Sequence, residues 1–158
     1  DPAYVYGLIR QESRFVSDAR SHVGASGLMQ VMPATARWTA KKAGLAYKPE
    51  LLTDRDFNLR IGTAYLKLVL DNFGGSQAMA AAAYNAGPGR PRRWREGPLL
   101  DAAVWAENIP FNETRDYVKR ELSNATIYAQ LLGGEAPELR ARLGRAIGPA
   151  SSPTSDLP

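Results

Sequence analysis

The chain lacks several residue types on which enzyme active sites are commonly built. Its 158 residues contain no cysteine and a single histidine, His22. The absence of cysteine excludes disulfides and thiolate metal sites, and it leaves the redox compartment open. A single histidine disfavours a Ser-His-Asp or Cys-His nucleophile system and a multi-histidine metal site. Any chemistry must therefore use carboxylates, tyrosines, amides or the backbone.

Long apolar runs are absent too. No run approaches the ~20 residues that span a bilayer, and the hydrophobic fraction of 44% suits one soluble domain with a real core. The chain begins at Asp1-Pro2, without an initiator methionine or a signal peptide. We therefore expect a mature or excised fragment, from which a targeting signal and neighbouring domains can have been removed.

Positive charge is in mild excess. The net charge of +4 fits a polyanionic partner, but many proteins with neutral partners share it. The densest basic cluster surrounds Trp94 and consists of Arg90, Arg92, Arg93 and Arg95. Nucleic-acid binding by base stacking would use such a cluster. A solvated loop with a packed tryptophan is the favoured interpretation.

Helical patterns dominate, and no convincing alternating strand pattern or internal repeat occurs. The segment Ser21–Met32 contains two glycines and is predicted to be a loop or short turn. We predict helices over residues 2–14, 33–43, 55–73, 77–85, 101–108 and 112–132. Their boundaries rest on capping residues and helix breakers, namely Asp1, Pro2, Pro33, Gly44, Gly74, Ser76, Gly87, Asp101 and Asn112. The predicted fold class is all-α, or nearly so.

The C-terminal end differs in composition. From Gly148 onward the segment GPASSPTSDLP is rich in proline and serine, which is typical of disorder. Residues 137–147 are expected to form at most a marginal helix. We therefore predict a folded domain over residues 1–133 and a partly disordered tail over residues 134–158.

One carboxylate, Glu12, stands on an apolar helix face. Ile9, Leu8 and Val5 precede it by three, four and seven residues, so the four side chains share one face. The neighbouring arginines lie at spacings that do not bring them to Glu12. A desolvated carboxyl has a raised pKa and can act as a general acid near neutral pH. A structural ion pair with a distant cation is the alternative that periodicity leaves open.

The segment that follows carries groups suited to a polar ligand. Gly24 and Gly27 allow the backbone to approach a ligand closely. Gln30 can donate and accept hydrogen bonds, which orients a polar substrate. Met29 and Met32 can line a cleft or fill the core, and the core is the default for a methionine taken alone.

Two later segments place polar groups on helices. Tyr84 and Asn85 end the run AAAAYN, where Tyr84 offers a hydroxyl and a flat face of sugar size. The alternative is a packed tyrosine with Asn85 as a C-terminal cap. Glu113 and Tyr117, four residues apart, share a face at the start of the last long helix. Their alternative is a first-turn acid that favours the helix dipole, beside an ordinary half-buried tyrosine.

Taken together, these segments carry a resemblance. The motifs ESRF, GLMQVMPATA, AYNAGPG and ENIPFNETRDYV occur in this order between about Tyr4 and Leu132. They closely resemble the catalytic domain of the soluble lytic transglycosylases, bacterial peptidoglycan-cleaving enzymes with a goose-type-lysozyme-like fold. The resemblance implies an all-α, lysozyme-like catalytic domain with a glycan-binding cleft over residues 1–133. The long helical N-terminal region of known soluble members and the tail after Gly133 have no counterpart in the match.

The resemblance also implies roles for individual residues. Glu12 matches the sole catalytic acid and base, whose pKa the apolar face would raise. Ser13 follows it and would help to hold the helix end, while Ser21 matches a serine near the acetamido group of the sugar. The implied substrate-binding residues are Ser21, Gln30, Met32, Tyr84, Asn85, Glu113 and Tyr117.

The reaction implied is a cleavage without water. Protonated Glu12 would donate to the glycosidic oxygen between N-acetylmuramic acid and N-acetylglucosamine, with Tyr84 and Ser21 steadying the acetamido group. The Glu12 carboxylate would then take the proton of O6, which attacks C1 and closes a 1,6-anhydro ring. An intramolecular nucleophile has a high effective molarity, so the second carboxylate of ordinary glycosidases is not needed. Glu113 is the challenger for a second role, and we assign it to substrate binding.

Three other interpretations stay open. A goose-lysozyme-type hydrolase would keep the fold and Glu12 but use water in place of O6. A non-catalytic glycan-binding module is disfavoured because it need not keep the set of Glu12, Gln30 and Tyr84. A nucleic-acid-binding domain rests only on the arginine cluster.

Partners and location follow from the implied substrate. We expect peptidoglycan glycan strands as the partner, with no nucleic acid, no membrane span, no metal and no organic cofactor. We also expect a monomer. A periplasmic location follows from the substrate rather than from any signal in this chain, and delivery by a secretion system or a phage is also compatible.

Overall fold

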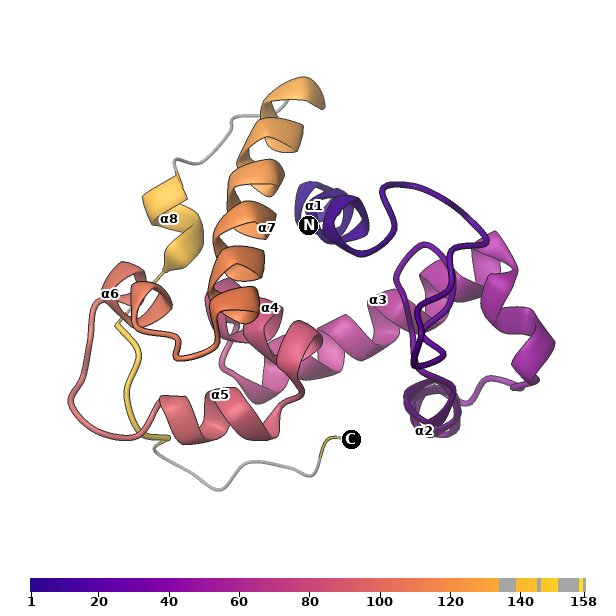
Figure 1. Cartoon of the computed structure of the whole chain (residues 1–158), viewed down its shortest axis with the longest axis horizontal. Helices are drawn as coiled ribbons and strands as arrows, with labels where there is room; N and C mark the ends of the chain where they lie inside the picture. The colour runs from indigo at the N-terminus through magenta and orange to yellow at the C-terminus, as the bar shows by residue number, and fades with distance from the viewer. Residues whose placement is uncertain (134–138, 145, 151–156, 158) are drawn as a thin grey trace.

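The computed structural model describes residues 1–133, 139–144, 146–150 and 157. Within these ranges the regular structure is helical, and extended pairing is limited to isolated bridges, which confirms the all-α prediction. No helix in the described part of the chain is long and apolar enough to cross a membrane. The helices (Figure 1) are α1 (Pro2–Glu12), α2 (Pro33–Ala43), the 3-10 helix η1 (Pro49–Thr53), α3 (Arg55–Asn72), α4 (Gln77–Ala86), α5 (Gly89–Trp94), α6 (Ala102–Glu107), α7 (Asn112–Leu131) and α8 (Leu139–Leu143).

Local signals set several helix ends where the sequence predicts them. Asp1 Oδ1 accepts a hydrogen bond from Ala3 N at 3.0 Å and caps α1. Ser76 Oγ accepts from Met79 N at 3.2 Å and caps α4. Gly44 closes α2 with a φ of 69°, a left-handed conformation that glycine adopts without steric cost.

Other local details differ from the predictions. η1 was not predicted, and α5 is a short helix where a loop was expected. Trp94, at the end of α5, packs edge-on against Phe111 with ring centroids 5.2 Å apart, so tertiary contact stabilises a helix too short to stand alone. Asn112 does not cap α7, because the capping position belongs to Phe111 and the Asn112 side chain accepts from Arg115 instead.

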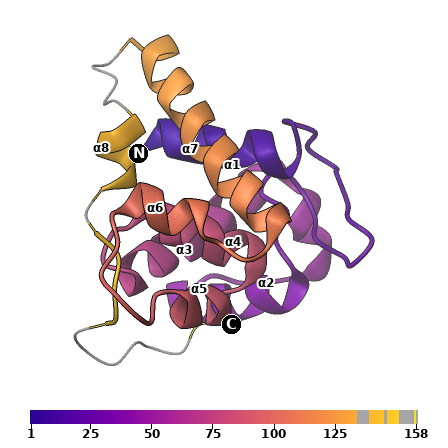
Figure 2. The ribbon, with the colours of Figure 1, turned by 60° about the vertical axis from the view of Figure 1, so that its left-hand side comes forward.

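The core forms where α1 crosses α7. These two helices make the most extensive contact between described elements, and Figures 1 and 2 show them crossing above α3 and α4. A Cβ atom on Gly7 would lie 2.8 Å from the backbone oxygen of Glu121, so only glycine permits this close crossing. Beneath it, the alanines of α4, Ala78 and Ala80–Ala83, are at most 1% exposed. This crossing brings the end of α1 beside α7.

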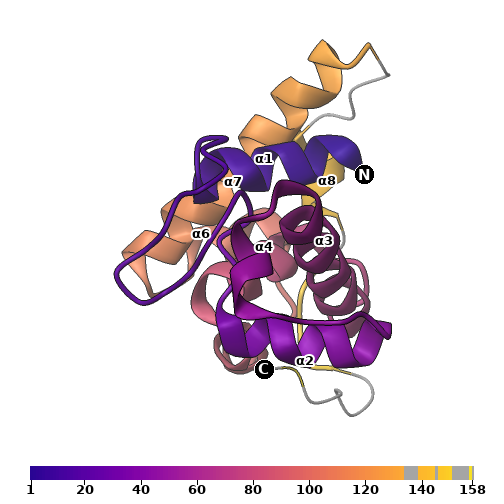
Figure 3. The ribbon, with the colours of Figure 1, turned by 90° about the vertical axis from the view of Figure 1, so that its right-hand side faces the viewer.

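A long loop connects α1 to α2. Figure 3 shows it running from the end of α1 at one side of the domain to α2 at the other. Ser26 and Val31 exchange backbone hydrogen bonds of 3.1 and 3.0 Å, and Gly27 N donates to Ala19 O at 2.8 Å. The predicted loop over Ser21–Met32 is confirmed, and these bonds give it a fixed shape.

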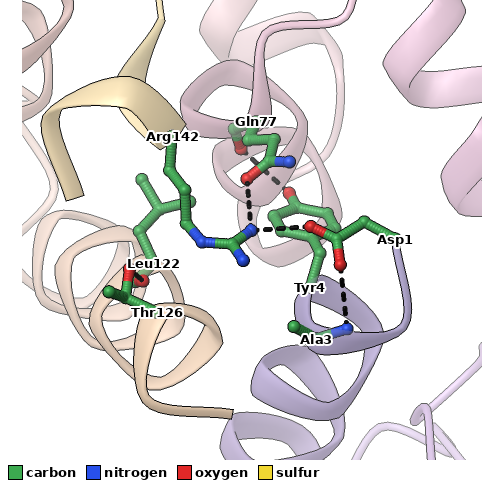
Figure 4. Close-up of polar contacts among 7 residues, drawn as sticks. All are labelled: Asp1, Ala3, Tyr4, Gln77, Leu122, Thr126 and Arg142. Atoms are coloured by element: carbon green, nitrogen blue, oxygen red, sulfur yellow. Dashed lines mark hydrogen bonds and ion pairs between the residues drawn. The ribbon is translucent and has the colours of Figure 1, made fainter. Parts of the chain in front are cut away.

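The short helix α8 is tied to the beginning of the chain. The buried side chain of Arg142 forms an ion pair with Asp1, with Nη1 2.7 Å from Oδ2 (Figure 4). The same nitrogen lies 3.4 Å from Gln77 Oε1, and the Tyr4 hydroxyl donates to the backbone oxygen of Gln77 at 2.9 Å. Asp1 therefore has two roles, as the cap of α1 and as the partner of α8.

The predicted marginal helix over residues 137–147 corresponds to α8. Ile147 is 4% exposed and exchanges backbone hydrogen bonds with Leu100 at 2.9 and 2.7 Å. Most of the disorder predicted from Gly148 onward concerns residues outside the described ranges. The division at residue 133 stays a prediction.

Candidate active site

Glu12 is the last residue of α1, and its carboxyl group reaches α7. The Tyr117 hydroxyl donates a hydrogen bond to Glu12 Oε1 at 2.8 Å. On the same face of α1, Leu8 and Ile9 are at most 2% exposed, and Val5 packs partly buried against the core. The predicted apolar surroundings of Glu12 are confirmed.

Burial raises the pKa of the Glu12 carboxyl from its ordinary 4.5 to about 7. The hydrogen bond from Tyr117 lowers it, because it stabilises the carboxylate, and the negative charge of Glu113 raises it further. A pKa near neutrality means that roughly half of the molecules carry a protonated Glu12 at pH 7. Such a group can donate and accept a proton in the same reaction.

A pocket of about 300 Å³ lies on the α7 side of Glu12. Glu113, which is exposed in the first turn of α7, and Asn85 both line it. Asn85 Oδ1 accepts a hydrogen bond from Thr114 Oγ1 at 2.7 Å, and the C-cap of α4 is Gly87, so the capping interpretation of Asn85 is wrong. In the described ranges, no group of three or more acids or histidines is placed to hold a metal ion.

A second pocket of about 470 Å³ lies on the loop side of Glu12. Ser21 and Gln30 both line it. Gln30 Nε2 donates to Ala19 O and Gly27 O, both at 2.8 Å, so its amide donors fix the loop. Ser21 Oγ accepts from Ala25 N at 3.0 Å, which leaves its own hydroxyl proton for another partner.

Tyr84 joins α4 to this loop. Its hydroxyl donates to Met29 O at 2.6 Å, and its ring packs against Tyr65 with centroids 5.8 Å apart. Burial raises the Tyr84 pKa well above 10, and the negative charge of Glu12 adds to the rise. Tyr84 itself lines neither pocket beside Glu12, whereas the other residues predicted for the site, except Met32, each line one of them.

Comparison with known proteins identifies the family to which this chain belongs. Residues 1–98 match the transglycosylase SLT domain, and residues 108–137 match the soluble lytic transglycosylase helical domain. The chain belongs to the transglycosylase SLT domain family. The soluble lytic murein transglycosylase of Escherichia coli (strain K12) is 43% identical over 135 residues, which are 83% of this chain and 21% of that protein. The SLT domain described above therefore spans about a fifth of the length of this curated relative.

Solved structures share the fold. The SLT domain matches an inactive glutamate-to-glutamine mutant of lytic transglycosylase Slt from Pseudomonas aeruginosa with a TM-score of 0.86 and 44% identity, over 94% of this chain and 24% of that one. It matches a complex of the 70-kDa soluble lytic transglycosylase with bulgecin A with a TM-score of 0.82 and 38% identity, over 92% and 24%. The resemblance and the lysozyme-like fold predicted from the sequence are confirmed.

One sequence interpretation of the loop in this SLT domain changes, and the default for Met29 is confirmed. Gly27 has a φ of 82°, and the Asn58 side chain lies so close that it occupies the place of a Cβ, so this glycine serves an internal contact rather than a ligand. Met29 is fully buried in the core, whereas Met32 is 37% exposed at the start of α2. Met32 lines neither pocket that contains Glu12, and its role in binding stays a prediction.

Sequence reasoning missed Asn58, which supports the whole loop. This α3 residue is fully buried and accepts from Met29 N at 2.8 Å. Its amide donates to Ser26 O at 2.8 Å and to Leu52 O at 2.7 Å. The sequence did contain a signal for Asn58, namely an amide within an otherwise apolar face of the helix. A polar side chain in such a position is expected to be buried and hydrogen-bonded.

The arginine cluster is part of the fold of the SLT domain. Arg90 lies over the Phe111 ring at 4.5 Å and donates to Ala86 O at 3.1 Å. Arg95 Nε donates to Gly148 O at 2.8 Å. These contacts favour the structural interpretation, and the expectation that nucleic acid is not a partner stays a prediction.

Proposed function

We propose that this chain cleaves peptidoglycan between N-acetylmuramic acid and N-acetylglucosamine by lytic transglycosylation, with Glu12 as the single general acid and base. The observation that carries the proposal is the Glu12 carboxyl, which has a pKa of about 7, accepts from Tyr117 and lies between two open pockets. The inactive glutamate-to-glutamine mutant of the Pseudomonas relative supports an essential glutamate in the family. The activity of the longer relatives is thereby proposed for this shorter chain.

The reaction balances with one carboxyl group. Protonated Glu12 gives its proton to the glycosidic oxygen, and the bond from that oxygen to C1 of muramic acid breaks. The positive charge on C1 is taken up by the ring oxygen or by the 2-acetamido oxygen as an oxazolinium. The Glu12 carboxylate then removes the proton of O6, and O6 bonds to C1. The products are an N-acetylglucosamine end and a 1,6-anhydro-muramic acid end, and Glu12 is again protonated.

Hydrogen-bond directions around Glu12 refine the roles of its neighbours. The Tyr84 proton is used on Met29 O, so toward a sugar its oxygen can act only as an acceptor, a role that suits the acetamido N–H. Ser21 can donate to the acetamido oxygen, because its own oxygen already accepts from Ala25. Asn85 Oδ1 is occupied by Thr114, which leaves its NH₂ group for sugar hydroxyls. The proposed substrate-binding set remains Ser21, Gln30, Met32, Tyr84, Asn85, Glu113 and Tyr117.

The role of Glu113 distinguishes this reaction from hydrolysis. A hydrolase needs a group that activates water, and Glu113 is the exposed carboxylate whose charge acts on Glu12. Its negative charge raises the Glu12 pKa, which keeps the acid protonated without requiring Glu113 to exchange protons. We therefore assign Glu113 to binding and to tuning of Glu12.

The remaining proposals concern context. We propose that residues 1–133 form the catalytic domain, that residues 134–158 are a C-terminal tail, and that the chain is a monomer that works on glycan strands in the periplasm. The proposed substrate supports this location, and the name of the Escherichia coli relative, soluble lytic murein transglycosylase, supports the substrate.

Mass spectrometry of the digestion products of purified peptidoglycan, in water enriched in ¹⁸O, tests the proposed function. Ends of 1,6-anhydro-muramic acid without ¹⁸O are expected, whereas reducing ends that carry ¹⁸O would refute transglycosylation and leave a hydrolase. Glu12→Gln is expected to lower the rate at least ~10³-fold, since it removes the only proton donor. Glu96→Gln, an exposed residue that lines neither pocket, is the matched control.

A further inference from the structure

The net positive charge of the chain is concentrated in one short segment. The chain contains 20 lysines and arginines and 16 acids. Residues 33–48, which form α2 and the segment after it, contain four of these cations and none of the acids, so the remainder of the chain has 16 of each. The four cations are Arg37, Lys41, Lys42 and Lys48, and we call them the α2 basic patch. Figure 3 shows α2 on the opposite side of the domain from α1, which carries Glu12.

The fold does not neutralise the charge of the α2 basic patch. All four cations belong to exposed residues. In the described part of the chain, none of the four lies within ion-pair distance of a carboxylate. The next acid along the chain, Glu50 in η1, is exposed and forms no ion pair with the patch.

Aromatic rings hold two of these cations in place. The guanidinium carbon of Arg37 lies 5.7 Å from the centre of the Tyr47 ring, which brings the segment that carries Lys48 beside α2. Lys42 Nζ lies 5.6 Å from the centre of the Trp38 ring. These cation–π contacts restrict the side chains before a partner binds. Less conformational entropy is therefore lost when an anion binds to them.

Helix stability alone does not explain the patch. Lys41 and Lys42 lie in the last turn of α2, where a cation interacts favourably with the helix dipole. That effect does not extend to Arg37 in the middle of the helix or to Lys48 beyond its end. Arg37 and Lys41 are also four residues apart, a spacing at which like charges destabilise a helix. An external anion would relieve this repulsion.

The surroundings of the α2 basic patch favour a hydrophilic polyanion over a lipid bilayer. No large hydrophobic side chain between residues 33 and 98 is exposed, so the patch has no apolar group to insert beside lipid headgroups. None of its four cations lines either pocket that contains Glu12. These observations favour an anionic polymer that contacts the domain outside the cleft.

Peptidoglycan is such a polymer, because the peptide stems along its glycan strands bear free carboxylates. We propose that the α2 basic patch binds stem carboxylates of peptidoglycan outside the cleft and thereby retains the domain on the cell wall between cleavages. The identity of the polymer rests on the proposed function. Contact at the patch raises the effective concentration of glycan at the cleft, so it acts on the KM for insoluble peptidoglycan rather than on kcat.

Sedimentation with purified, insoluble peptidoglycan measures this binding. Glu12→Gln is introduced into every protein, so that the polymer is not cut during the assay. One variant of the patch combines Lys41→Gln with Lys42→Gln, and a second combines Arg37→Gln with Lys48→Gln. Each removes two charges, and the first leaves the contact between Arg37 and its aromatic ring intact.

A matched control removes the same charge elsewhere. Arg93→Gln combined with Arg140→Gln changes two exposed arginines, one on α5 and one on α8. Three probes separate the sources of negative charge. They are intact peptidoglycan, peptidoglycan whose stem carboxylates have been converted to amides, and vesicles of phosphatidylglycerol. Each probe is used at low and at physiological salt.

The parent protein is expected to bind intact peptidoglycan more tightly than the amidated form, and the difference should shrink as salt rises. Each patch variant should bind intact peptidoglycan about 3- to 10-fold more weakly, as expected for two exposed charges. Its binding to amidated peptidoglycan should not change, and the control should bind like the parent.

Two results would overturn the inference. The first is a pair of patch variants that bind intact peptidoglycan as tightly as the parent, or that lose binding equally to the amidated form. The second is tighter binding to vesicles than to peptidoglycan, lost in the patch variants, which would assign the patch to lipid headgroups.

Activity separates this inference from the proposed function. With Glu12 restored, the patch variants should keep kcat, raise the KM for insoluble peptidoglycan and cut short soluble glycan fragments like the wild type. An unchanged KM together with unchanged sedimentation would overturn the inference and leave the role of Glu12 intact. If the wild type forms no anhydro ends but sediments through the patch, the proposed function fails and the binding of stem carboxylates stands.

Discussion

Replacing Tyr117 with phenylalanine isolates the electrostatic role of α7. The change removes the hydroxyl that donates to Glu12 Oε1 at 2.8 Å and keeps the ring, which is 8% exposed. That hydrogen bond stabilises the carboxylate and lowers the Glu12 pKa, while burial holds it at about 7. Without the bond the carboxylate loses its donor, so the pKa must rise.

The size of the rise follows from the hydrogen bond. A bond to a charged group contributes about 1.5 to 3 kcal/mol, and the partial exposure of Glu12 reduces this to about 1.4 kcal/mol by solvent screening. One pKa unit corresponds to about 1.4 kcal/mol, so the Glu12 pKa should rise by about one unit. At pH 7 the protonated fraction would grow from roughly half to roughly nine-tenths.

The pH dependence of kcat/KM measures this shift, because it reports the pKa of the acid in the free enzyme. Proton donation requires protonated Glu12, so kcat/KM should fall above about pH 7 in the wild type and about one unit higher in Tyr117→Phe. The plateau itself should drop, because Glu12 loses an orienting partner. Tyr47→Phe is the control, since its hydroxyl is buried and has no hydrogen-bond partner in the described structure. An alkaline limb that stays in place or moves down would refute the role of the Tyr117 bond.

Two further changes test the support of the site. Asn58→Ala removes three buried hydrogen bonds and should lower the free energy of unfolding by about 3 kcal/mol in urea denaturation, with loss of activity from a loosened loop; the partly exposed Asn124→Ala should change little. Burial raises the Glu121 pKa well above 4.5, so its contribution to stability is fully present below pH 4.5 and is lost as the pH rises toward the folded-state pKa. Because Glu12 also has a raised pKa, the test is made in the Glu12→Gln background, where its titration is removed. There, Glu121→Gln should flatten the fall in melting temperature between pH 5 and 8. An unchanged slope would contradict a buried, uncharged Glu121.

Helix boundaries could be predicted because their causes are local. The cap at Asp1 and the left-handed end at Gly44 depend on neighbours a few residues away. Predictions failed where a distant contact decides the local structure. Packing of Trp94 on Phe111 accompanies a helix where a loop was predicted, and Gly27 makes room for Asn58 rather than for a ligand.

The sequence by itself determined the helical fold, the four motifs and the anomaly of a carboxylate on an apolar face, because periodicity and residue chemistry are properties of neighbouring residues. Only the tertiary structure decided that Glu12 meets Tyr117, 105 residues away, and lies between two open pockets. The physical reason is the close crossing of α1 and α7 at Gly7, which sets the surroundings of the carboxyl group. Those surroundings, rather than the residue alone, give Glu12 a pKa near neutrality.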